Sequence, residues 1–100
     1  MVTVQLKIVE EGLKHPLSEM KSAIAASLFD DDIIVKDDAN LELKIKFTTE
    51  DHQDLILLQL RDSGSKHKIN EKVIHYIENS WIRDVASEAR ALLAPSTVIH

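Results

Sequence analysis

Residues 41–47, with the sequence LELKIKF, alternate between apolar and charged side chains. Side chains two residues apart lie on the same face of a β-strand, so this period indicates a strand with one buried face and one solvated face. Residues 55–60, LILLQL, break the rule, because Leu55 and Leu57 fall on the face that carries charge in the preceding strand. The two segments predict a sheet that packs on a core through one face and needs some contact for Leu55 and Leu57 on the other.

The first third of the chain predicts a strand, a helix and a second, short strand. Residues 2–8 alternate in the same way as residues 41–47, and residues 33–35 form a brief β-branched run. Between them, residues 17–28 carry apolar side chains at helical spacing. Pro16 stands just before this pattern, where its fixed φ suits the first helical turn. We therefore predict an amphipathic helix between two strands.

The last third predicts one long helix. Asn70 is a favourable N-cap residue, and Pro95 cannot continue a helix. With strands at 41–48 and 54–61, the predicted order is β-α-β-β-β-α. The expected fold class is α+β, a two-layer sandwich with a largely antiparallel sheet and both helices on one of its faces. Residues 1–94 would form a single domain, and residues 95–100 a C-terminal tail.

Composition narrows the function classes. The chain has 100 residues, 44% of them apolar, and no cysteine, so a disulfide framework and a thiolate metal site are excluded. The N-terminal segment alternates too strictly for a signal peptide, and no apolar run reaches the length of a membrane span. We expect a cytoplasmic protein that does not act at a membrane. The sequence indicates no metal site and no cofactor, since only 2 glycines are present and no phosphate-binding loop is found.

The net charge of −5 is unevenly distributed along the chain. In the predicted topology, the second strand leaves from one acidic segment and the hairpin of the third and fourth strands turns in another. Six carboxylates are therefore expected at one end of the sheet: Asp30, Asp31, Asp32, Glu50, Asp51 and Asp54. Such a cluster would attract a protein partner with a basic surface through its screened field.

A homodimer is also predicted. Leu55 and Leu57 form an apolar pair on the open face of the sheet, and clustered exposed apolar residues indicate an interface. The alternative is that the tail or the first strand covers them. The apolar stripe of the predicted long helix rotates along its length. Either the helix bends near Asn79 and Ser80, or its later turns, with Trp81, Ala86 and Ala89, pack on the second copy.

The competing function is a nucleic-acid binder or nuclease that uses the basic side chains of the open face, Lys7, Lys44, Lys46 and Arg61. Glu42-x-Lys44, preceded by Asp37 and Asp38, resembles the acidic-x-Lys signature of restriction-endonuclease-like nucleases. That resemblance implies carboxylates that hold Mg²⁺ and a lysine that helps to activate water.

Two further patterns lie around residue 70. The run GSKHKxNEK, with Lys66, His67 and Lys68, resembles the lysine-bearing helix start of double-stranded-RNA-binding domains, which implies recognition of the RNA backbone. Acidic composition and the bulky residues of the following turns depart from that family. His67, Glu71, His75 and Glu78 would share one helical face at metal-ligand spacing, although a solvated polar stripe is the expected arrangement.

No nucleophile, general base and orienting group recur together in the sequence. The expected function is therefore non-enzymatic: a small interaction module of the inhibitor, immunity or adaptor type. It would dock a basic partner through the acidic sheet end, as a homodimer, and nucleic acid is not the expected ligand.

Overall fold

The structure, a computed structural model, describes residues 2–9, 11 and 16–93. It is an α+β fold with one five-stranded sheet and two helices. In chain order, the elements are β1 (Val2–Ile8), α1 (Leu17–Asp30), β2 (Ile33–Val35), β3 (Leu41–Glu50), β4 (Gln53–Asp62), β5 (Lys68–His75) and α2 (Trp81–Leu93). The predicted α+β class is confirmed, and the predicted tail at residues 95–100 lies outside the described residues.

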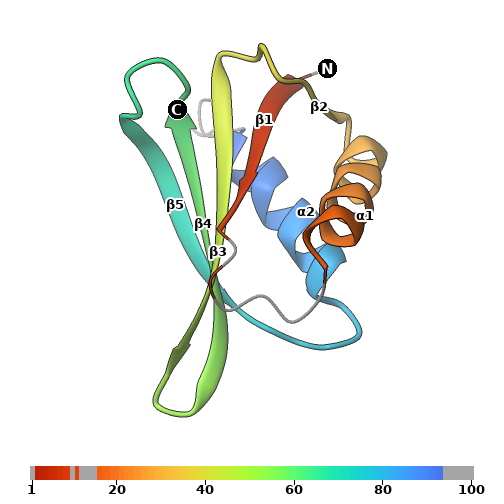
Figure 1. The fold of residues 1–100 in the computed structure, drawn as a ribbon, viewed down its shortest axis with the longest axis vertical. Coiled ribbons are helices and arrows are strands. Elements are labelled where there is room, and N and C mark those ends of the chain that lie inside the picture. The colour runs from red at the N-terminus through yellow and green to blue at the C-terminus, as the bar shows by residue number, and fades with distance from the viewer. Residues whose placement is uncertain (1, 10, 12–15, 94–100) are drawn as a thin grey trace, which may run out of the picture.

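The sheet is mixed, which corrects the prediction of a largely antiparallel one. Its strand order is β2-β1-β3-β4-β5. β1 lies between β2 and β3 and runs parallel to both, whereas β3, β4 and β5 are successively antiparallel. The crossover through α1 returns the chain parallel to β1, and residues 36–40 then carry it across to the other side of β1 (Figure 1). A three-residue strand such as β2 shows no periodicity that could indicate its direction.

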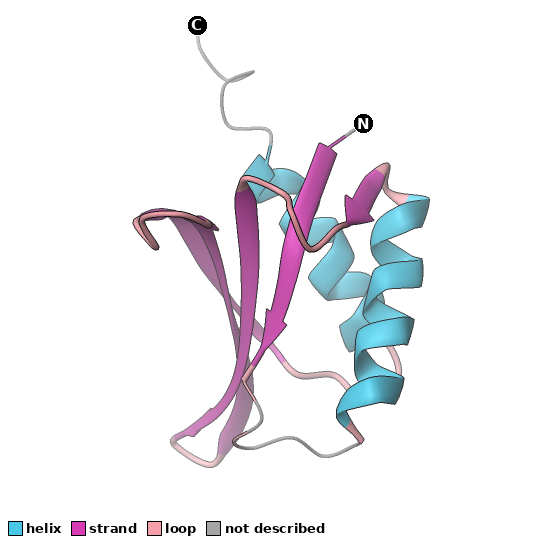
Figure 2. Cartoon of the chain, turned by 45° about the horizontal axis from the view of Figure 1, so that its top comes forward, coloured by secondary structure: helices cyan, strands magenta, loops and turns pink. Residues whose placement is uncertain are grey.

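Both helices pack on the same face of the sheet, as predicted, and the opposite face is not covered by either helix (Figure 2). The core lies between the sheet and the two helices. Its fully buried side chains come from both layers and include Val4, Ile24, Leu28, Leu43, Ile45, Ile56, Leu58 and Val85. The alternation of β3 explains this placement, because Leu43 and Ile45 point to the helices while Lys44 and Lys46 point away. No helix of the described chain is both long and apolar enough to cross a membrane.

Residues 68–75 form strand β5, so the predicted helix over residues 70–94 is wrong in its first half. Ile69, Val73 and Ile77 recur every fourth residue, a spacing that fits a helix face as well as one face of a strand. The β-branched side chains of this segment favour the strand. A ten-residue β4 also supplies a pairing partner on its far side, which a sequence pattern does not reveal.

The break between β5 and α2 explains the rotation of the apolar stripe in the sequence. The chain leaves β5 at His75, turns, and begins α2 at Trp81, where the Ile77 carbonyl accepts hydrogen bonds from the amides of Ser80 and Trp81. The Ser80 hydroxyl donates to the Asp84 carboxylate at 2.9 Å. The two halves of the stripe therefore belong to different elements: Val73 and Ile77 are exposed, whereas Val85 and Ala89 of α2 face the core.

Candidate interaction surface

The open face of the sheet carries one row of side chains from each of four strands. We define the open face by the residues that point away from the helices: Thr3, Gln5 and Lys7 on β1; Glu42, Lys44, Lys46 and Thr48 on β3; Leu55, Leu57, Gln59 and Arg61 on β4; and Glu71, Val73 and His75 on β5. The cross-strand register places them in order, with Glu42 opposite Arg61 and Lys46 opposite Leu57. This agrees with the register predicted for β3 and β4.

A buried ionic network lies at one end of the open face. Glu42 is 3% exposed, although it sits on the face that no helix covers. One carboxylate oxygen, Oε1, accepts hydrogen bonds from Nε and Nη2 of Arg61, and the other, Oε2, accepts one from Nζ of Lys66 at 2.9 Å. The turn between β4 and β5 folds back over Glu42 to place Lys66 there. It is held by hydrogen bonds from the Ser65 amide and hydroxyl to Asp62.

Arg61 and Lys66 keep the carboxyl group of Glu42 ionised. Burial alone would raise the pKa of its carboxyl group, because a charge is less stable away from water. Hydrogen bonds from Lys66 and Arg61, together with their positive charges, outweigh this effect and hold the pKa of Glu42 below its ordinary value of 4.5. Glu42 is therefore an ionised, fully paired side chain at neutral pH.

Leu55 and Leu57 form the centre of an apolar stripe next to this network. Both are half-buried, and the register places Leu57 between Lys46 and Val73. Val73 is 51% exposed. Neighbouring strands thus cover these leucines partly, and no described segment lies over them. The stripe of Leu55, Leu57 and Val73 is continuous across β4 and β5.

The open face has a cationic border, and its described residues include no Phe, Tyr or Trp. Lys7, Lys44, Lys46 and Arg61 all lie on it, as the sequence indicated. Three aromatic rings lie on the other face instead: Phe47 of β3, Tyr76 just after β5 and Trp81 of α2 form one cluster with ring centroids 5.4 to 6.1 Å apart. The described part of this face therefore offers charge and aliphatic area, and the imidazole of His75 is the one ring that it presents to a nucleic-acid base.

The nuclease-like pattern does not assemble as a metal site. Glu42 is the residue that would have to hold Mg²⁺, and both of its oxygens are occupied by Arg61 and Lys66. Lys44 lies on the same face, but Asp37 and Asp38 belong to the exposed turn before β3. The carboxylate is thus neutralised by protein cations instead of being presented to a metal ion.

The predicted acidic cluster is split between the two ends of the sheet. Because β2 and β3 are both parallel to β1, the start of β2 and the end of β3 lie at opposite ends. Asp30, Asp31 and Asp32 therefore lie at one end, and Glu50, Asp51 and Asp54 lie around the β3–β4 hairpin at the other (Figure 1). The prediction of a single acidic cluster is wrong because it assumed that β2 and β3 are antiparallel.

The two acidic groups have different surroundings. Asp31 lies 3.5 Å from Arg90 of α2 in an ion pair, so this group is partly neutralised. At the hairpin, Asp54 accepts a hydrogen bond from the Thr49 hydroxyl at 3.0 Å. Asp51 and its neighbour His52 form a tight two-residue turn with φ of 50° and 65°. The six predicted carboxylates therefore do not meet at one site for a partner.

Three of the five predicted dimer-interface residues are buried inside their own chain. Trp81 is 5% exposed, and Ala86 and Ala89 are fully buried between α2 and the rest of the core. Their small side chains let α2 approach α1 and the sheet, which explains why alanine recurs there. Leu55 and Leu57 alone remain on an uncovered surface.

The metal-ligand spacing and the lysine run predicted around residue 70 do not lie on a helix, because residues 68–75 form strand β5. His67 lies in the turn before β5, Glu71 and His75 lie on the open face of β5, and Glu78 follows the strand. Glu71 pairs with Lys68 at 3.2 Å and accepts a hydrogen bond from Gln59 at 3.1 Å. The lysines of GSKHK precede a strand and not a helix, so the helix start implied by the RNA-binding resemblance is absent from the described chain.

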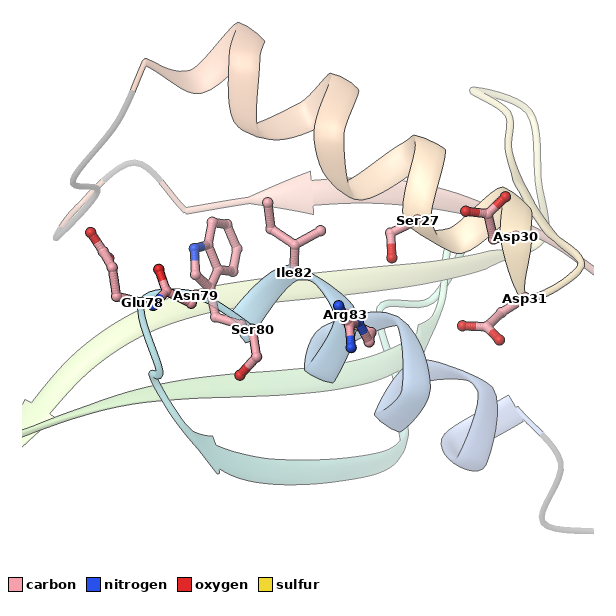
Figure 3. A pocket seen from close by; sticks show the side chains of 9 residues that line it. Ser27, Asp30, Asp31, Glu78, Asn79, Ser80, Ile82 and Arg83 are labelled. Carbon is pink, nitrogen blue, oxygen red and sulfur yellow. The ribbon is translucent and has the colours of Figure 1, made fainter.

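A groove lies between the two helices. It has a volume of about 480 Å³ and runs along α2 from Glu78 and Asn79 to Asp30 and Asp31 at the end of α1. Figure 3 shows Ile82 pointing from α2 toward α1, with Arg83 beside it on α2 and Asp30 and Asp31 at the end of α1. The groove brings together carboxylates, amide and hydroxyl groups and one guanidinium, and no histidine or lysine is among the described residues that line it. It is an open polar groove.

Comparison with known proteins supports the fold alone. No protein-family model matches the chain, and no match is found among curated proteins. Among solved structures, the chain is similar to TolB from Acinetobacter baumannii, with a TM-score of 0.53 and 8% sequence identity. The match covers 96% of this chain but 28% of that one, so the chain corresponds to about a quarter of the TolB structure. At this identity the similarity concerns the arrangement of helices and strands.

Proposed function

We propose that this chain is a small, non-enzymatic interaction module, of the inhibitor, immunity or adaptor type, that contacts a protein partner through the open face of its sheet. The observation that carries the proposal is the continuous stripe of Leu55, Leu57 and Val73 on a face that no described segment covers. Aliphatic side chains that cluster on an exposed surface are typical of protein-binding sites. The paired network of Glu42 makes the adjoining end of this face rigid.

The chemistry of the border specifies the partner. Lys44 and Lys46 flank the stripe on β3, Glu42 is neutralised by two cations, and Glu71, next to Val73 on β5, is paired with Lys68. A complementary partner would present an apolar patch with carboxylates around it, because opposite charges at the border speed association and exclude wrong partners. This proposal replaces the basic partner expected from the sequence, since the carboxylates predicted to attract it lie at two ends of the molecule.

Nucleic-acid binding is the second candidate, favoured by the same cations. It predicts binding of heparin or nucleic acid that weakens steeply with salt, since each neutralised phosphate releases counterions. The interaction module should show no such binding at physiological salt. The overall charge of −5 and the lack of Phe, Tyr and Trp among the described residues of the open face support the protein-binding function.

The proposal is tested by placing a photoreactive amino acid at Leu57 and, as a matched control, at Ser22, which is exposed on α1. In the native host, irradiation should give one discrete cross-linked protein from position 57 and none of the same mass from position 22. A cross-link of the same yield at both positions, or none at position 57, would show that the open face is not the contact surface.

A further inference from the structure

We infer that strand β5 pairs with β5 of a second copy of this chain, antiparallel and centred on Val73, to join two five-stranded sheets edge to edge. This inference goes beyond the proposed function, because it concerns the edge of the sheet and leaves the open face exposed in both copies. The two edge strands of the sheet differ in length. β2 ends the sheet with three residues, whereas β5 ends it with eight and has no described neighbour on its outer side. A long unpaired edge invites pairing with another strand.

The backbone of β5 has its free groups in the right places. The Tyr76 amide donates to the Asp54 carbonyl at 2.9 Å, so these two residues form a hydrogen-bonded pair of the antiparallel ladder. Hydrogen-bonded and non-hydrogen-bonded pairs alternate along such a ladder. The amides and carbonyls of residues 72 and 74 therefore point to β4. Those of Glu71, Val73 and His75 point outward, toward the position of an added strand.

The side chains of β5 are complementary to themselves about Val73. Among the exposed large apolar residues, Ile69, Val73 and Ile77 follow one another at intervals of four, with 50%, 51% and 54% of their surface exposed. Antiparallel pairing centred on Val73 places Val73 opposite Val73 of the second copy. Ile69, beside an irregularity in the β4–β5 register, and Ile77, two residues past the end of β5, then lie at the two ends of the paired segment. Burial of such a row removes aliphatic area from water on both copies. It also joins the two apolar stripes of the open faces across the symmetry axis.

Charge disfavours two of the other registers. With Val73 at the centre, Glu71 of each copy lies opposite His75 of the other copy. The backbone groups of both residues point outward, so they can take part in the new hydrogen bonds. Moving the centre to Lys72 would set two lysines directly opposite one another, and moving it to Glu71 would set two glutamates opposite. Like charges at directly opposed positions destabilise a sheet.

A groove beside β5 provides carboxylates for Lys72 of the second copy. It has a volume of about 320 Å³ and lies between the β5 edge and α2, lined by Val73, Ile74 and Ile77 together with Asp84, Ser87 and Glu88. Lys72 lies on the same side of β5 as Ile74, because the two residues are two positions apart. In the dimer, Lys72 of each copy is opposite Ile74 of the other and therefore approaches the carboxylates of that groove.

The test is the mass in solution of the native chain and of two variants at Val73. Sedimentation of the native chain should give a particle of about twice 11.3 kDa at micromolar concentration. The substitution Val73→Lys places two ammonium groups opposite one another on the symmetry axis. It should raise the dimer dissociation constant at least tenfold and give a monomer. Val73→Thr, which keeps the β-branched shape, should remain a dimer. A native chain that is monomeric at several hundred micromolar would overturn the inference, as would a dimer that survives Val73→Lys.

Cysteine cross-linking tests the register and does not depend on the folding of Val73→Lys. The chain has no native cysteine. Opposed residues of a hydrogen-bonded pair have Cα atoms about 5.5 Å apart, within the range of a disulfide. Val73→Cys should oxidise to a covalent dimer, and a mixture of Glu71→Cys and His75→Cys chains should form mixed dimers. Lys7→Cys, on β1, should do neither. Equal cross-linking at Lys7, or none at Val73, would contradict β5 pairing, and either result leaves the cross-link test at Leu57 unaffected.

Discussion

Replacement of Glu42 by glutamine should destabilise the protein by about 3 kcal/mol at neutral pH, the lower part of the range for breaking a buried ion pair by removing one partner. Glu42 is 3% exposed and Arg61 is 17% exposed, so the substitution leaves a largely buried guanidinium without its counter-charge. For a domain of this size the melting temperature should fall by roughly 15 °C. Thermal unfolding followed by circular dichroism measures the change.

The pH dependence gives this prediction a second, independent readout. Because the folded-state pKa of Glu42 lies below its ordinary value of 4.5, its ionised form stabilises the fold fully above that ordinary value. The stabilisation is lost as the pH falls through the lowered folded-state pKa. The difference in melting temperature between the native chain and Glu42→Gln should therefore be largest at neutral pH and shrink in strong acid. A difference that is constant with pH would mean that the ionic network contributes nothing.

The control for Glu42 is the outer cation of the same network. Lys66 is 52% exposed, so water replaces most of what its pairing contributes, and Lys66→Gln should cost less than about 1 kcal/mol. A Lys66 variant that is as unstable as Glu42→Gln would show that the turn over Glu42, and not the Arg61 pair, holds this end of the sheet.

Replacement of Trp81 by alanine should cost about 4 kcal/mol, as large-to-small substitutions of buried aromatic residues do. Trp81 begins α2 and is 5% exposed. Its ring stacks on Tyr76 at 5.8 Å and meets the edge of Phe47 at 5.4 Å, so it joins α2 to β3 and to the end of β5. The melting temperature should fall by roughly 20 °C, or the chain should not fold.

The matched variant is Trp81→Phe, which retains an aromatic ring against Phe47 and should lose less than half as much stability. Circular dichroism is the appropriate readout, because Trp81 is the 1 tryptophan of the chain and both substitutions remove the fluorescence signal. A fall of less than about 5 °C for Trp81→Ala would contradict a docked α2. It would instead support the prediction that this side chain contacts a second copy.

The sequence predicted the elements whose pattern is local. β1 and β2 have the predicted bounds, α1 begins within one residue of the predicted position, and the β3–β4 register follows from alternation and the length of the turn. In these segments one face is buried, so a shift by one residue would expose the whole apolar row.

The elements that depend on distant partners were not predicted. β5 becomes a strand because β4 offers an edge, and its residues Ile69, Val73 and Ile77 fit a helix equally well in isolation. The direction of β2 depends on where the chain crosses β1, and an error there moved Asp30, Asp31 and Asp32 to the wrong end of the sheet. Sheet order is a global property, and local periodicity carries no information about it.

The candidate surface was predictable in part. The positions of Leu55 and Leu57 follow from the broken alternation, and Glu42 opposite Arg61 follows from the register of the hairpin. Val73 and the third member of the ionic network, Lys66, were not found because both depend on the chain turning back after β4. An acidic residue and an arginine opposed across two adjacent strands were the available signal for the network.

The most direct test of the open face as the binding surface is the affinity of the protein captured at position 57 for two sets of variants. Leu57→Asp places a charge in the centre of the apolar stripe and should weaken binding at least a hundredfold, since an apolar contact is lost and a carboxylate is desolvated. The double variants Asp31→Lys with Asp32→Lys, and Glu50→Lys with Asp51→Lys, change charges away from the stripe and should alter affinity less than threefold. The opposite pattern, with Leu57→Asp binding normally and a charge-reversed variant failing to bind, would contradict the account and place the partner on an acidic end of the sheet.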